Sequence, residues 1–405
     1  GWVGSIGLAG AVATGGSTEV DEETGETSGS QNYGVGISGI SLINEVTDTA
    51  DAYMRNVDLT LGEVAALAVN ATNKSKILSL GGAIAAVNGN SLESTASLGL
   101  AGAYGQNTVE QTTQAYLEAV NQQSASESLD QLKVEASNTS QIMTVNLGGA
   151  GAIASDANVA IAGAVTINEV NNKTQAYLIE STLDGAGTTT VEALDKSKIH
   201  GDAGGAALAV GLSADSNAAA ISVGVGLAYN DIDNTTRAFI DNTYLDSHGD
   251  VSVTAKSTSA IEAFALGAAV SVSSTASWLG LSLAGAGAGS KNDINNTIAA
   301  YVSNGSTVNT FNGGTVTVSA KDESDITADA GGYALAVALS GSAAAGSLSV
   351  GVSIAENEIK NNIDAYVEQS TVTSDGAVSI DATSTATVDA LSIGGAAAVS
   401  TGELT

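Results

Sequence analysis

Residues 316–330 read VTVSAKDESDITADA, and they alternate between two kinds of side chain at every step. Val316, Val318, Ala320 and Ile326 belong to a mostly apolar or small set, whereas the residues between them are Thr, Ser, Lys, Glu and Asp. Such a period of two is typical of a β-strand with one buried and one solvated face. A straight strand of this length would extend about 50 Å, which is longer than most strands. The run is therefore expected to bend, as strands do at the corners of a β-solenoid.

Comparable stretches recur along the chain about every 62 residues. The anchor of each unit is an Ala followed by an aromatic residue, with an Asn nine positions before the aromatic. The aromatic residues are separated by 63, 61, 62, 62 and 65 residues, so they predict a tandem array. The aromatic column consists of Tyr53, Tyr116, Tyr177, Phe239, Tyr301 and Tyr366. The asparagine column consists of Asn44, Asn107, Asn168, Asn230, Asn292 and Asn357.

The array is predicted to be continuous over residues 1–405, without separate domains. Residues 15–31 interrupt the first unit with an acidic, polar insertion, which is expected to form a surface loop at one edge. Most units close on a pair of glycines, and these pairs set the approximate boundaries. The units are 1–82, 83–149, 150–205, 206–267, 268–332 and 333–395, followed by the start of a seventh at 396–405.

The composition excludes several classes of protein. The chain has 12 basic and 43 acidic residues, a net charge of −31, no Cys and no Pro. A chain without Cys has no disulfides, thiolate metal sites or cysteine nucleophiles. The negative charge disfavours nucleic acid and anionic membranes as partners, because basic residues recognise both. The absence of Pro agrees with a fold made of unbroken hydrogen-bonded strands.

The other half of each unit is rich in Ala, Gly, Ser and Val, as in residues 266–290 and 331–355. Each of these stretches is long enough for a transmembrane helix. They are dense in Gly and Ser, however, and they alternate in twos, which favours a thin solenoid interior where small side chains let two sheets approach closely. The predicted fold is therefore all-β: a repetitive β-solenoid, similar to a parallel β-helix, without membrane insertion.

The asparagine column is predicted to lie inside the fold, where Asn side chains can hydrogen-bond between successive coils. An acid follows the Asn in most units, on the opposite face: Glu45, Glu169, Asp231, Asp293 and Glu358, with Thr108 as the exception. One coil per unit would stack these carboxylates about 4.8 Å apart, which is unfavourable. We therefore expect several coils per unit, so that the acids of successive units lie about 14 Å apart, unless divalent cations bridge the acids. Ca²⁺ is a weak candidate there, since solvated acids explain the pattern as well.

The aromatic column has two interpretations. The rings can stack on one another as a ladder that stabilises the fold. Alternatively, they form an exposed tyrosine stripe for lateral packing of chains or for stacking against sugars. The sequence leaves both open.

Signatures of an enzyme are weak, and no catalytic residue is predicted. His200 and His248 occupy non-equivalent positions in their units, and neither has the partners of a catalytic triad or metal site in its local sequence. Carbohydrate-cleaving β-helices need clustered carboxylates, but a catalytic site is expected to break the regularity of the repeats. The chain is therefore predicted not to be an enzyme.

One unit contains Asn230-Asp-Ile-Asp-Asn-Thr-Thr-Arg-Ala-Phe239 and then Gly249-Asp-Val-Ser-Val-Thr-Ala-Lys-Ser-Thr-Ser-Ala-Ile261, followed by an Ala/Gly-rich stretch. This pattern resembles the repeat regions of large exported bacterial filamentous adhesins, of the leukotoxin type and similar to filamentous haemagglutinin. The resemblance implies secretion, a place on the bacterial cell surface, and a role as an extracellular filament or adhesin stalk. The implied partner is the protein itself, through homopolymeric or lateral fibre contacts, and surface glycans are a second. The alternative function is a module that binds glycans or Ca²⁺, and a membrane-active toxin segment is a more distant one.

Overall fold

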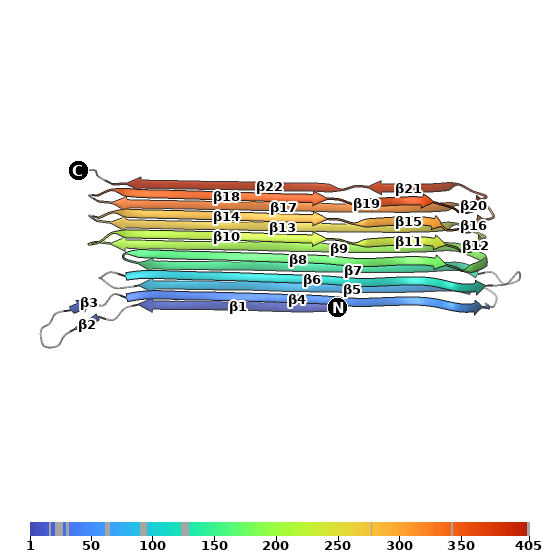
Figure 1. Ribbon diagram of the computed structural model, residues 1–405, viewed down its shortest axis with the longest axis horizontal. Helices are drawn as coiled ribbons and strands as arrows, with labels where there is room; N and C mark the ends of the chain where they lie inside the picture. The colour runs from blue at the N-terminus through green and yellow to red at the C-terminus, as the bar shows by residue number, and fades with distance from the viewer. Residues whose placement is uncertain are drawn as a thin grey trace.

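The structure is a computed structural model that describes residues 1–15, 18–20, 27–29, 32–60, 65–89, 95–122, 129–276, 278–341 and 343–402. These residues form 22 strands, of which 20 belong to one parallel sheet (Figure 1). The predicted all-β, solenoid-like fold is thereby confirmed. In these ranges no helix has the length and apolar character needed to cross a membrane.

The chain coils through two layers, and each long strand pairs in parallel with the strand of the same layer in the next coil, as β4 does with β6 and β13 with β17. Layer one contains β4 (Asn32–Leu59), β6 (Thr95–Gln122), β8 (Ala157–Ile179), β10 (Ala218–Ile232), β11 (Thr235–Asp241), β14 (Gly280–Ile294), β15 (Thr297–Ser303), β18 (Ala345–Ile359) and β19 (Asn362–Val367). Layer two contains β1 (Trp2–Gly15), β5 (Ala65–Gly89), β7 (Leu129–Ala154), β9 (Thr182–Ser213), β13 (Val251–Thr275), β17 (Val316–Ser340), β21 (Val378–Ser384) and β22 (Thr387–Thr401).

Short strands turn the chain from layer one to layer two in the later coils. They are β12 (Tyr244–Ser247), β16 (Thr307–Thr310) and β20 (Thr371–Ser374), which pair with one another in parallel. Around this corner the coil has three sides, whereas the remainder of the coil has two.

The acidic insertion predicted at 15–31 lies mostly outside the described residues. Its described parts are β2 (Thr18–Val20) and β3 (Thr27–Gly29), which form a separate antiparallel pair.

The strand register corrects the number of coils per unit. Ile221 pairs with Val159 on one side and with Leu283 on the other, so equivalent residues 62 positions apart are direct neighbours. One unit therefore makes one coil, and the expectation of several coils is wrong. The 15-residue alternation that was expected to bend is part of β17, which continues for 25 residues. β17 is held at this length by parallel pairing on both sides, with β13 and with β21 and β22.

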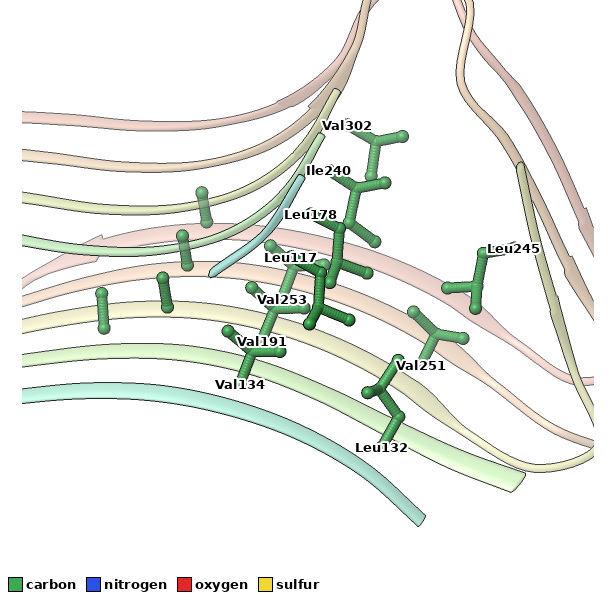
Figure 2. Packing of buried hydrophobic residues seen from close by; sticks show 14 of the residues in the cluster. Leu117, Leu132, Val134, Leu178, Val191, Ile240, Leu245, Val251, Val253 and Val302 are labelled. Carbon is green, nitrogen blue, oxygen red and sulfur yellow. The ribbon is translucent and has the colours of Figure 1, made fainter. Parts of the chain in front are cut away.

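The interior changes from large to small side chains along the coil. At the three-sided end, Leu, Ile and Val from both layers pack together, as Figure 2 shows for Leu117, Leu178, Val191 and Val253. A middle cluster contains Val and Ile, including Val170 and Ile199. In the remaining half of the coil, the buried hydrophobic clusters consist of alanines. We call this half the wing.

The backbones of the two layers touch in the wing. A Cβ built on Gly205 would overlap the carbonyl oxygen of Val225, and one on Gly267 would overlap that of Gly287. Gly148 and Gly332 make the same kind of approach to the opposite layer. The Gly pairs of the sequence therefore include inward positions where a larger residue does not fit, as the thin-interior prediction requires.

A corner residue of each coil has a left-handed backbone. Its φ is 56° at Asn56, 51° at Ala119, 52° at Glu180, 43° at Asn242, 55° at Asn304 and 50° at Gln369. Asn tolerates this conformation better than other non-glycine residues do, because its side chain bonds locally. Ala119 and Glu180 have no such compensation by residue type.

Replacing Ala119 by Asn is therefore expected to stabilise the fold, by roughly 0.5–1 kcal/mol, because it relieves part of the left-handed strain. Urea unfolding of the two proteins measures the difference. Ala119→Val is the control, and it should destabilise, since a β-branched residue fits this conformation worst. Equal stability of all three proteins would contradict the assignment of strain to this corner.

Candidate functional site

The six asparagines of the asparagine column stack inside the coil between the two layers. Each side-chain Nδ2 donates to the Oδ1 of the next Asn, from Asn44 through to Asn357, at 2.7–2.8 Å. Thr144 of layer two donates to Asn168 at 2.8 Å, so this column also bonds across the layers. At Asn107, Asn168 and Asn292 the side chains are 0–1% exposed. The column thus satisfies its own buried amides.

A second set of asparagines completes the backbone pairing where layer one is interrupted. The backbone N–H of Asn172 donates to Oδ1 of Asn234 at 2.9 Å, and that of Asn234 donates to Oδ1 of Asn296 at 3.2 Å. Their side-chain amides then reach layer two, where Asn234 donates to Asp195 at 2.9 Å. The side-chain carbonyl of Asn234 or Asn296 therefore accepts the hydrogen bond that a backbone carbonyl of the next coil would accept in an uninterrupted strand.

Asp195 is the buried carboxylate at the centre of this network, with 1% exposure. Besides Asn234, it accepts hydrogen bonds from Ser197 at 2.8 Å, Asn138 at 3.1 Å and Thr174 at 3.2 Å. Burial raises the pKa of Asp195 to about 6, and these donors oppose the rise. The network was not identified from the sequence, although the polar column at Asn138 and Asp195 is visible there.

The raised pKa of Asp195 gives a stability change with a defined sign. Between about pH 4 and 6 the unfolded chain has lost this proton, while the folded chain still holds it. Stability should therefore fall as the pH rises through this window and level off above it. The wild type should lose roughly 2 to 3 kcal/mol more between pH 4 and 7 than Asp195→Asn, in which the site does not titrate. Urea unfolding across this range measures both; equal pH dependence would contradict the raised pKa.

The aromatic column lies on the outer face of layer one. Its successive rings are parallel within 1–7°, with centroids 4.7–5.0 Å apart. Arg55 lies over Tyr53 and Tyr116, at 5.3 and 5.5 Å from the ring centroids, and donates to Glu118 at 2.7 Å. Burial raises the pKa of Tyr177 to about 12, so its hydroxyl stays protonated at neutral pH.

The rings stack as the ladder interpretation expects, and the ladder lies on the outer face of layer one. A role of this stripe in lateral packing or sugar binding stays a prediction. The faces of the inner rings are covered by their neighbours. A sugar that stacks on an aromatic ring needs a free face, so it finds mainly ring edges along this stripe.

The acid column lies on the same outer face. Glu169, Asp231, Asp293 and Glu358 occupy successive coils in register, and Thr108 separates Glu45 from them. Burial raises the pKa of Asp231, with further contributions from Asp293 and Glu169. The like charges that the sequence argument separated are therefore adjacent.

Lysines two positions away relieve part of this repulsion. Lys291 lies 3.0 Å from Asp293 and 3.5 Å from Glu356, and Lys360 lies 2.7 Å from Glu358. Exposure to water and salt screens the remainder. Within the described ranges, no three His, Asp or Glu side chains are grouped so that they could hold a metal ion.

His200 has two carboxylate partners. Its Nδ1 lies 3.2 Å from Glu262 and its Nε2 lies 3.1 Å from Asp202, while Lys198 donates to Glu262 at 2.6 Å. Glu262 is one coil away, so the 62-residue offset is the signal that could have found this group. His248 lies instead against Phe311, with ring centroids 5.7 Å apart.

No family model, no curated protein and no solved structure matches this chain.

Proposed function

We propose that this chain is the structural part of an exported bacterial surface protein, where it forms a stalk or filament without catalytic activity. The asparagine column carries the proposal, because it links each coil to the next by a buried side-chain bond in addition to the backbone bonds. A buried polar column favours one stacking register over its alternatives. Fixed nearest-neighbour stacking gives a stiff array, which is the mechanical property that a stalk requires.

Surface labelling of the cells that make the protein tests this proposal. A gold-labelled antibody against residues 157–303 should decorate the outside of intact cells, on projections that proteolysis of intact cells removes. Labelling that appears only after the cells are permeabilised would contradict export.

The alternative function, binding of glycans or Ca²⁺, has weaker support. The adjacent carboxylates at Asp231 and Asp293 favour a cation more than the expected wide spacing did. Titration calorimetry with Ca²⁺ should give heat if a cation bridges them, and Asp231→Asn with Asp293→Asn should abolish it. No heat, together with an unchanged melting temperature in EDTA, would remove Ca²⁺ from consideration.

A further inference from the structure

We propose that the outer face of layer one in the wing is an interface between two copies of this chain, packed face to face. We call it the wing face: the outward side chains of 33–42, 96–105, 157–166, 219–228, 281–290 and 346–355. The proposal rests on the proposed function as a structural array and names the surface through which arrays associate laterally.

The wing face is apolar, and in its first three coils a ridge runs beside a groove, whereas Val225 and Val352 occupy the groove position in the fourth and sixth coils. Strand register aligns Val35, Leu98, Val159, Ile221, Leu283 and Leu348 in one unbroken ridge. Four residues further along the strands, Gly39, Gly102 and Gly163 form the floor of an open groove beside Tyr104 and Val165. Side chains on the face are exposed, as at Ile161, which is 42% exposed. A ridge and a parallel groove on one face can interlock with the same relief on a second copy.

The size of the wing face is sufficient for a stable dimer. Ten residues of strand cover about 33 Å, and six coils cover about 29 Å, which gives roughly 900 Å² on each copy. A standard interface buries about 800 Å² per partner, and the largest apolar patch of a typical monomer is about 300–600 Å².

The charge distribution favours a second copy as the occupant. The chain has a net charge of −31, yet the six segments of the wing face contain no Asp, Glu, Lys, Arg or His. Two wing faces can therefore meet without bringing charges into contact, whereas an anionic membrane would be repelled by the rest of the molecule.

The same charges select the orientation of the two copies. The acid column borders the wing face three positions beyond residue 42, at Glu45 and its equivalents. If the strands of both copies ran in the same direction, the two acid columns would face each other. A twofold axis along the stacking direction reverses the strands and separates the columns by about 50 Å, several Debye lengths. Each column then lies near the wing turns of the partner, where the described acids are Asp156 and Asp215.

The outer face of layer two in the wing fits this role less well. Asp202 and Asp329 occupy the same register position as Phe264, so carboxylates enter that face. Leu147 alternates with Gly204 along the coils, and a Cβ on Gly204 would lie 2.9 Å from Leu147 Cδ2. This face of layer two therefore carries charges, and side chains of the chain itself fill part of its relief.

Sedimentation velocity over a range of concentrations tests the proposal. The wild type should associate, and more strongly with added salt, because salt screens the repulsion between the charged halves. Ile161→Lys should weaken association about a hundredfold or more, since each dimer then buries two unpaired charges. Leu208→Lys is the matched control: Leu208 is 43% exposed on the other face of the wing, and its change should leave association intact. Circular dichroism and melting confirm that both variants fold.

Cross-linking provides an independent measurement, because the chain contains no cysteine. With the strands reversed and the ridge at Val159 seated over the groove at Gly163, position 161 lies opposite its own copy. Two Ile161→Cys chains should therefore form a disulfide under mild oxidation, whereas two Thr254→Cys chains, in which the cysteine lies on β13 outside the wing, should not.

Three outcomes would overturn the proposal. They are a wild type that stays monomeric at high concentration and salt, association lost in Leu208→Lys but kept in Ile161→Lys, and a monomer that binds neutral phosphatidylcholine vesicles through Ile161. None of these affects the surface labelling that tests the proposed function.

Discussion

Replacing Gly267 by Ala should destabilise the array by about 3 kcal/mol or more, the largest effect expected of a single methyl group here. The new Cβ would overlap the carbonyl oxygen of Gly287 in the opposite layer. Both groups belong to backbone held on two sides by pairing, so neither can move without breaking ladder hydrogen bonds. The midpoint of urea unfolding and the melting temperature measure the loss.

Gly151→Ala is the matched control for this prediction. Gly151 also lies in the wing of layer two, but a Cβ there has no neighbour within 4 Å. Ala at this position should be neutral or slightly stabilising, since Gly in a strand interior is unfavourable. If both substitutions have the same effect, the close approach of the layers does not limit the wing.

Replacing Asn168 by Ala should cost about 3 to 5 kcal/mol, the second large effect. The change removes the acceptor of Asn107 and of Thr144, both at 2.8 Å, and the donor to Asn230 at 2.7 Å. All of these groups are buried, and each unsatisfied group costs about 1–3 kcal/mol. Because coils interact mainly with their neighbours, the array should lose cooperativity at this coil. Calorimetric melting should therefore show a broadened or divided transition.

Asn171→Ala controls for the change of residue type. Asn171 lies three residues away on the same strand, and its side chain is exposed on the outer face. This substitution should shift stability by less than about 0.5 kcal/mol. Equal losses at the two positions would mean that the buried column contributes little to stability.

Much of this fold could be predicted from residue order. The asparagine column was predicted to lie in the interior, and Asn107, Asn168 and Asn292 are buried. The small side chains of the wing predicted that two layers would approach closely, and the overlap at Gly205 bears this out. Both inferences depend on the local order of side chains, which determines the buried face of a strand wherever that strand lies in the fold.

The coil length could not be predicted in the same way. Strands of 25 to 32 residues, such as β13 and β9, carry no local signal that they continue instead of bending. The repulsion between Asp231 and Asp293 argued for wide spacing, but screening and nearby lysines offset it. The His200–Glu262 contact was missed for the same reason, because it exists only if one unit is one coil.

The pairing of each coil with the next along nearly its whole length also determines how the molecule would bear tension. One coil advances the stack by about 4.8 Å, so reaching 1,000 Å would take about 200 coils and about 13,000 residues. In return, a pull along the stacking direction is shared by all the backbone bonds between two coils, so no single bond carries the load. Such a stack is short for the number of residues it uses, but it resists rupture. Its weakest points under force would be the turns that join the layers.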